Sequence, residues 1–573
     1  MARFSGKAVL MTPAVGIDLG TTSSRVAWLD GDRPRLIPCP GGSFSMPSAV
    51  SFRESGEVLT GARALDGAVL DPDSTVLSAR RLLGLSFSER PGPAAGPFPS
   101  RIVRGPGGLA AFGAGGRRRT PQEAAGAVLA ALRRAAERHL GREVREAVIT
   151  VPALFDSVRR QAVRDAARMA GLEPRLMSGS LAAAVAALLR SGYSGKVAAV
   201  SLGGGFLDIT VADFDGGVVE VVAAGGDLGL GGDDFDSRVA VWLLKQFLDY
   251  SGVDLSRDAT AMARLRAAAE KARIELSSAS TTTVALPGIS ADAPGAELRA
   301  VLNRQHLQRL TEDFAAKLAA ACYAAMKEAA LSPREAGRLI LCGNMARMPG
   351  ISEVIERVFR QSHSWGADGD GASALGAAVQ AGIVKGRIRD LLLIETLPVS
   401  LGLEAGEGAV SGLIPKNTSL PREERRIFST AGDGQTRMVL KLVQGEGPLA
   451  ENCRSLGSAE ISGITPAPAG VPEIEALFFM GPDGVLSVAA RELGSSRDLA
   501  VVMSEAGGLP PGTVGQLAEE FGVRRAAELA GEAGLEGKGE GRRAGAAGPS
   551  GAAGQTASGA SGPAGAGGQA ASG

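Results

Sequence analysis

Residues 15–22 read VGIDLGTT, and this stretch determines how the rest of the chain is interpreted. An apolar run ends in Asp18, a glycine and two threonines follow, and this pattern is typical of a buried strand that enters a tight turn. Backbone N–H groups exposed in such a turn bind phosphate, and a nearby carboxylate can hold a hydrated metal ion. The alternative is an ordinary hairpin turn, because short glycine motifs occur in many settings.

A second unit of the same kind occurs later in the chain. Residues 197–200 are apolar, residues 203–205 are three glycines, and residues 207–211 begin a returning strand. We interpret the two units as an internal duplication, in which two similar lobes each contribute a phosphate-binding turn to one cleft. The strands alternate with helical segments, so the sequence predicts an α/β fold for this part of the chain.

Composition excludes several classes of function. Lys plus Arg and Asp plus Glu both number 61, so net charge gives no reason to expect nucleic acid or a membrane as a partner. We find no apolar stretch long enough to span a bilayer. The four cysteines lack the spacing of metal or redox motifs, which suits a reducing compartment. We therefore predict a cytoplasmic protein.

Local signals divide the chain further. Thr120, Pro121 and Glu123 form a helix start with a capping box. Residues 90–116 are rich in proline and glycine and predict an irregular excursion. After residue 398, short alternating segments separated by turn signals predict a compact all-β domain. Residues 541–573 contain almost nothing large enough to bury, which predicts disorder.

In this order, the motifs resemble those of the heat shock protein 70 family, the DnaK-type molecular chaperones. The resemblance covers about residues 14–505 and includes GIDLGTT (16–22), AVITVPA (147–153), LGGG (202–205), GGDDFDSR (231–238), AAEKARIELSS (268–278), ALGAAVQ (374–380) and DLLLIE (390–395). It implies an actin-like ATPase domain of two lobes, followed by an all-β sandwich that binds peptides and a short helical tail.

The resemblance also implies domain limits, ligands and partners. The expected parts are a nucleotide-binding domain (1–388), a linker (389–397), a β-sandwich (398–505), a vestigial lid helix (506–535) and a disordered tail (536–573). The expected ligands are ATP or ADP with Mg²⁺, and K⁺ as an additional ion. The expected partners are unfolded or extended polypeptides, a J-domain co-chaperone and a nucleotide exchange factor, and a role in stress response is implied. The short lid predicts fast peptide release.

Nucleotide-site residues follow by matching positions. Asp18 is expected to hold magnesium through water and, with Arg80 and Asp208, to serve catalysis. The residues expected to bind the nucleotide are Gly20, Thr21, Thr22, Gly203, Gly204, Gly205, Glu270, Arg273, Ser277, Gly343 and Arg347. Glu270 and Ser277 are two helical turns apart and can share a face, but a solvated helix face is the alternative.

The second half of the resemblance gives a peptide groove and a coupling set. The expected groove residues are Val399, Leu401, Leu403, Phe428, Ala431, Met438 and Leu440, and the alternative is that these residues form the sandwich core. Both positions of the arch that closes over the peptide, Gly406 and Ala431, are small, so an open arch is expected. The residues expected to couple the domains are Arg160, Leu391, Leu392 and Leu393.

Four residues depart from the family pattern at the catalytic site. Arg80 occupies the place of the catalytic lysine, and Gly179 that of the catalytic glutamate. Ser201 and Phe206 replace a carboxylate and a hydroxyl that faces the γ-phosphate. Arg and Lys are not interchangeable at a tight site. Losing one acid or base group costs about 10²–10⁴-fold in rate. Outside this set, Asn344 replaces a glycine in the third nucleotide motif.

The sequence therefore predicts an ATP-binding chaperone of extended hydrophobic segments whose hydrolysis is weak. One alternative is a fully active ATPase with compensating groups, and another is a nucleotide-gated scaffold without hydrolysis. A sugar or acetate kinase on the same duplicated fold has no use for the β-domain or for the linker at residues 390–395, which argues against that class.

Overall fold

The computed structural model describes residues 13–90, 98, 100–189, 191–290, 295–366, 371–505, 509 and 512–517. Its first lobe is built on a mixed sheet in the order β12-β11-β1-β2-β3, with β4 paired to β2. The strands are β1 (Ala14–Asp18), β2 (Ser23–Asp30), β3 (Arg33–Leu36), β4 (Met46–Pro47), β11 (Glu146–Val151) and β12 (Glu173–Ser178). Strand β1 runs parallel to β11 and antiparallel to β2, so the VGIDLGTT stretch ends in the predicted hairpin.

The second lobe repeats this pattern in the order β19-β18-β13-β14-β15-β20. The strands are β13 (Gly195–Leu202), β14 (Leu207–Asp215), β15 (Val218–Asp227), β18 (Arg338–Cys342), β19 (Ser364–Trp365) and β20 (Leu392–Ile394). Strand β13 is antiparallel to β14 and parallel to β18, as β1 is to β2 and β11. The prediction of a duplicated α/β domain is confirmed.

Two helices, α4 (Gly179–Leu188) and α10 (Ala372–Val384), pack closely against each other between the lobes. Both are rich in alanine, and a Cβ added at Gly376 would lie 2.7 Å from the Cα of Ala182 and closer still to its carbonyl oxygen. Gly16 of β1 approaches the backbone of α10 in the same way. Small residues thus allow the lobes to join through backbone contact, which larger side chains would prevent.

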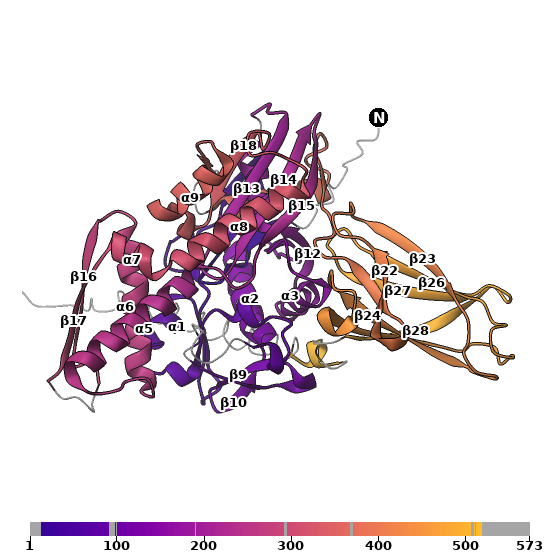
Figure 1. Ribbon diagram of the computed structural model, residues 1–573, viewed down its shortest axis with the longest axis horizontal. Helices are drawn as coiled ribbons and strands as arrows, with labels where there is room; N and C mark the ends of the chain where they lie inside the picture. The colour runs from indigo at the N-terminus through magenta and orange to yellow at the C-terminus, as the bar shows by residue number, and fades with distance from the viewer. Residues whose placement is uncertain are drawn as a thin grey trace, which may run out of the picture. The chain divides into compact units, whose positions relative to one another are not determined.

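Further helices cover the sheets of both lobes (Figure 1). They are α2 (Pro121–Leu140) and α3 (Ser157–Met169) in the first lobe, and α5 (Gly232–Ser251), α6 (Ala259–Leu276), α7 (Arg304–Leu310), α8 (Glu312–Glu328) and α9 (Pro349–Phe359) in the second. Helix α2 starts as predicted, because Thr120 accepts a hydrogen bond from Glu123 N and Glu123 accepts one from Thr120 N. Beside α5 to α7 lies the hairpin of β16 (Thr281–Pro287) and β17 (Glu297–Asn303).

The prediction of an irregular excursion over residues 90–116 is wrong for its second half. Here β8 (Arg101–Arg104), β9 (Ala110–Ala114) and β10 (Arg117–Arg119) form a three-stranded antiparallel sheet. Its glycines belong to turns, since Gly107, Gly108, Gly115 and Gly116 have positive φ angles. The neighbouring element is α1 (Ala62–Gly67), beside the small sheet of β5 (Val50–Phe52), β6 (Val58–Thr60) and β7 (Thr75–Val76).

The all-β domain is an eight-stranded antiparallel sheet in the order β22-β21-β24-β25-β28-β27-β26-β23. Its strands are β21 (Leu401–Glu404), β22 (Val410–Ile414), β23 (Arg422–Phe428), β24 (Arg437–Gln444), β25 (Arg454–Ser462), β26 (Ile474–Met480), β27 (Leu486–Glu492) and β28 (Arg497–Glu505). The prediction of an all-β domain is confirmed. Residues 513–517 are helical, while the rest of the predicted lid and tail lies outside the described residues.

Candidate functional site

The two glycine turns approach each other closely and line one cavity. A Cβ added at Gly204 would lie 2.5 Å from Thr22 Cγ2, and one at Gly205 would lie 2.5 Å from Thr21 Oγ1. Threonine is branched at Cβ and has little freedom to move away. Glycine is therefore required in the second turn for the close approach of the first, and both turns line the cavity as the sequence predicted.

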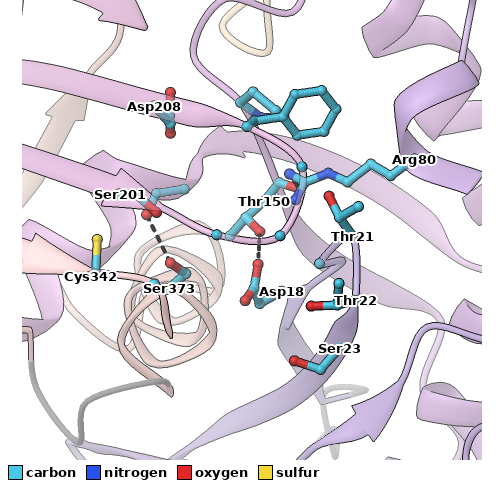
Figure 2. Close-up of a pocket in the computed structure, with 18 of the residues that line it drawn as sticks. Asp18, Thr21, Thr22, Ser23, Arg80, Thr150, Ser201, Asp208, Cys342 and Ser373 are labelled. Atoms are coloured by element: carbon cyan, nitrogen blue, oxygen red, sulfur yellow. Dashed lines mark hydrogen bonds between the residues drawn. The ribbon is translucent and has the colours of Figure 1, made fainter. Parts of the chain in front are cut away.

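Asp18 stands at the end of β1 on the floor of this cavity. Its Oδ1 accepts a 2.6 Å hydrogen bond from Thr150 Oγ1 at the end of β11 (Figure 2). The parallel pairing of β1 with β11 positions this contact, because both strands end at the same edge of the sheet. A half-buried carboxylate held on one side by a hydroxyl is suited to a hydrated divalent cation on the other.

Arg80 reaches the cavity from the short 3₁₀ helix η2 (Ala79–Leu82). Its Nη2 donates to the carbonyl oxygen of Thr150 at 3.3 Å, and its buried Nε has no hydrogen-bond partner among the described residues. The guanidinium carbon lies 5.6 Å from the ring centroid of Phe206 and 6.0 Å from that of Phe155. Burial lowers the pKa of Arg80, while Asp18 and Asp208 oppose this effect. Arg80 is therefore a buried cation whose Nε–H makes no hydrogen bond to the described residues. We call the cavity lined by Asp18, Arg80 and the two glycine turns the phosphate cavity.

The Asp208 carboxylate accepts hydrogen bonds from two backbone N–H groups and does not point freely into the cavity. Its Oδ1 accepts from Ala153 N at 2.6 Å and its Oδ2 from Ser180 N at 3.0 Å. Burial raises the pKa of this carboxyl, and these hydrogen bonds oppose the rise. Asp208 thereby fixes the segment that contains Gly179, where an added Cβ would lie 3.7 Å from Asp208 Oδ2. A Cβ fits at position 179 in ordinary van der Waals contact.

Five of the residues expected to bind the nucleotide do not gather around one cavity. Gly343, with a φ of 82°, lines the phosphate cavity, and Glu270 lines a neighbouring cavity that meets the first at Thr21 and Thr22. Arg273 forms a buried ion pair with Asp236, with Nε to Oδ1 at 2.6 Å. The other two are engaged locally: Ser277 Oγ donates to the carbonyl of Arg273, and the Arg347 guanidinium carbon lies 4.8 Å from the ring centroid of Trp365.

Together the two cavities fit a nucleotide with magnesium. The phosphate cavity offers glycine backbone, the Asp18 carboxylate and the Arg80 cation. The neighbouring cavity has an apolar wall and three carboxylic acid side chains; its lining includes Leu65, Ala68, Val69, Leu77, Asp233, Asp236 and Glu270. Polyphosphate therefore suits the first cavity and an uncharged nucleoside suits the second.

A clasp that the sequence did not reveal joins the lobes over this cleft. Ser78 Oγ donates to Asp233 Oδ2 at 2.7 Å, and Arg81 donates to both carboxylate oxygens of Asp234 at 3.0 and 2.9 Å. These bonds connect η2 in the first lobe with the first turn of α5 in the second. The segment that carries Arg80 is consequently tied to the opposite lobe.

The buried Asp233 carboxyl in this clasp is expected to make the free energy of unfolding depend on pH. Burial raises the pKa of Asp233 to about 7, with contributions in the same direction from Asp236 and Asp234 and opposing ones from Arg81 and Ser78. The folded protein thus retains this proton where the unfolded chain, with the ordinary value of 3.8, has lost it. The stability that this proton contributes to folding is complete below pH 3.8, the pKa of Asp233 in the unfolded chain. It is lost as the pH rises to about 7, the pKa in the folded protein.

We therefore expect the melting temperature to fall between about pH 5 and pH 8 by more than in Asp233→Asn. Thermal unfolding followed by circular dichroism over this range measures the difference. Equal slopes for the two proteins would rule out Asp233 as the titrating group.

Most residues of the expected peptide groove are buried. The side chains of Leu401, Leu403, Met438 and Leu440 belong to the core cluster of the β-domain, and Phe428 packs against it. Ala431 is exposed and Val399 is half-buried. Leu401, Leu403, Met438 and Leu440 therefore form part of the sandwich core, which was the alternative to a peptide groove. Contact of these side chains with a peptide stays a prediction.

The expected coupling residues lie where the linker and the β-domain meet the nucleotide-binding lobes. Strand β20 pairs in parallel with β15, and Leu391 and Leu393 pack on the core beneath while Leu392 is exposed. The fully buried Arg160 donates from Nε to Phe155 O at 2.8 Å and from Nη1 to Asp483 O at 3.0 Å. Asp483 also forms a 2.6 Å ion pair with Arg164, a residue the sequence did not single out.

No helix within the described residues is long and apolar enough to cross a membrane. The cysteines Cys39, Cys322, Cys342 and Cys453 are free thiols.

Comparison with known proteins identifies the family. The family model described as Hsp70 protein matches residues 14–541. The mitochondrial 70 kDa heat shock protein of Pisum sativum is 37% identical over 508 residues, which are 88% of this chain and 75% of the relative. Because that relative is mitochondrial, it contradicts our prediction of a cytoplasmic location. The duplicated α/β lobes, the following eight-stranded β-domain and these two matches show that the chain belongs to the Hsp70 family.

Proposed function

We propose that this chain is an Hsp70 chaperone that binds ATP with magnesium and releases extended apolar peptides under nucleotide control, but hydrolyses ATP slowly. Membership of the Hsp70 family makes the chain an ATP-dependent chaperone of unfolded polypeptides. The observation that carries the proposal of slow hydrolysis is the lining of this cavity, where the Arg80 guanidinium carbon lies 5.6 Å from the ring centroid of Phe206 and position 179 is a glycine. The cavity can hold phosphate charge but has few groups that move a proton.

Several parts of the cavity have a proposed role in holding the nucleotide. Bound Mg·ATP supplies the phosphoryl group and the metal charge for the reaction. The glycine turns donate backbone N–H groups to phosphate, Thr21 and Thr22 add hydroxyls, and Asp18 orients the hydrated metal. Glu270, Arg273, Ser277, Gly343 and Arg347 remain our proposal for the nucleoside end.

Catalysis is weak for a geometric reason. In phosphoryl transfer the protein mainly positions water and stabilises charge. The Arg80 guanidinium is fixed by Thr150 O and two aromatic rings, and Gly179 presents no carboxylate to a water molecule. Arg80 can thus stabilise charge on a phosphate, but the described cavity offers no carboxylate at position 179 to accept a proton from water.

Coupling to the β-domain is proposed to run through the linker. Glu395 follows β20 and accepts a 2.9 Å hydrogen bond from Ser178 N, next to Gly179. Burial raises the pKa of Glu395, and Arg160 opposes this rise. A change at the phosphate cavity that moves the start of α4 therefore reaches the linker directly. Unfolded polypeptides, a J-domain co-chaperone and an exchange factor are the proposed partners.

Calorimetric titration and a turnover assay test the proposal together. We expect ATP with magnesium to bind, and its turnover to be at least about 10²-fold slower than that of an active family member. ATP should also weaken the binding of an extended apolar peptide by about tenfold. Turnover at the ordinary family rate would favour the fully active alternative. Absence of ATP binding would favour the scaffold alternative.

A further inference from the structure

The phosphate cavity adjoins a second space besides the cavity lined by Asp233, Asp236 and Glu270, which we call the nucleoside cavity. Arg25 lines both the phosphate cavity and an open surface groove. The groove is formed by Arg33, Arg35, Ser43, Phe44 and Ser45, among others. Gly371 also lines the groove and directly precedes the cavity residue Ala372 at the start of α10. The cavity thus adjoins two spaces, one at Thr21 and Thr22 and one at Arg25.

The β-hairpin places Arg25 next to the catalytic carboxylate. Arg25 and Asp18 are directly opposite in the antiparallel pair of β1 and β2. Side chains of such a pair lie on the same face of the sheet, about 5 Å apart at Cβ. Arg25 is only 9% exposed although it is charged. A buried arginine beside Asp18 at the wall of a phosphate cavity is placed to contact an anion that leaves the glycine turns.

The groove is the more basic of the two neighbouring spaces. The nucleoside cavity has Asp233, Asp236 and Glu270 in its lining together with Arg266, and Asp236 is paired with Arg273. The described residues that line the groove include three arginines and no carboxylate, although Asp30 pairs with Arg35 at 2.9 Å. A free phosphate is therefore attracted to the groove.

We propose that the groove defined by Arg25, Arg33 and Arg35 is a binding site and exit path for inorganic phosphate. Phosphate leaves the glycine turns past Arg25 and reaches solvent between Arg33 and Ser43, while the nucleoside diphosphate stays in place. The step breaks no covalent bond. The inference rests on the proposed nucleotide function, because it needs a phosphate to be released beside Asp18.

The test measures equilibrium binding of inorganic phosphate to the full chain loaded with ADP and magnesium, by calorimetry. Hydrolysis is not needed for this experiment. We expect Arg25→Met, which keeps the length of the side chain without its charge, to weaken phosphate binding by about tenfold or more. The exposed Arg33→Gln should weaken it about two- to fivefold without touching the core. The matched control is Arg101→Gln, another exposed arginine on a strand, which should bind phosphate as the parent does.

The outcomes separate the two proposals. Failure of the parent protein to bind ADP overturns the proposed function and the exit path with it. Normal ADP binding without phosphate binding overturns the exit path alone. Phosphate binding that is unchanged in both Arg25→Met and Arg33→Gln also overturns it. If Arg25→Met does not fold, Arg33→Gln against Arg101→Gln decides the question.

Discussion

Restoring the four departures in one variant, Arg80→Lys, Gly179→Glu, Ser201→Asp and Phe206→Thr, is expected to raise the single-turnover rate of ATP hydrolysis by about 10²–10⁴-fold. The backbone tolerates a side chain at the central position, because an added Cβ at position 179 meets no atom closer than 3.7 Å. Arg80 rests on the ring of Phe206, so neither residue can be restored usefully alone. We therefore expect single variants to gain little, since groups that act as a unit do not add.

Rapid quench of radiolabelled ATP under single-turnover conditions measures this gain. The matched control adds Asp18→Asn to the restored variant, which removes the metal-orienting carboxylate and should return the rate to the low parental level. If the restored variant binds ATP as the parent does and still hydrolyses it at the parental rate, the four positions do not limit catalysis.

Substituting Gly376→Val is expected to cost at least about 3 kcal/mol of folding free energy. A Cβ at this position would overlap the backbone of Ala182, so α10 and α4 must separate for any side chain to fit. Backbone at the centre of a helix cannot rotate away as a side chain can. The same two helices join the lobes, and the variant should therefore lose nucleotide affinity together with stability.

Urea unfolding followed by circular dichroism measures this loss. Gly67→Val is the matched control, because Gly67 also lies in a helix but has no atom within 4 Å of an added Cβ. It should change stability by less than about 1 kcal/mol. Equal stability of the two variants would show that the α4–α10 contact tolerates separation.

Local signals in the sequence were sufficient to predict the helix start at Thr120 and the two glycine turns. The capping box at Thr120 and the two glycine turns are set by neighbouring residues, so they could be read from the chain directly. The sheet of β8 to β10 was missed because its turn glycines dominate a short segment. The core position of Leu401 was left open because groove and core residues of a sandwich alternate in the same apolar pattern.

Contacts between residues far apart in the chain could not be predicted from the sequence. Ser78 and Asp233 are 155 residues apart, and neither belongs to a motif that names the other as a partner. The sequence did not single out Arg81, yet its pairing with Asp234 connects the two lobes. The burial of Arg25 follows from the pairing of two strands rather than from its own surroundings in the chain.

The pairing of β20 with β15 also bears on self-association. Without the linker, β15 would become the outer strand of its sheet, with the backbone groups of residues 218–220 unpaired and Val218, already 38% exposed, at its margin. Such an edge accepts a strand from another chain. A linker that leaves during the chaperone cycle would thus turn the protein briefly into an acceptor for strands of its own kind. The time spent in that state would then set an upper limit on the concentration at which the protein remains monomeric.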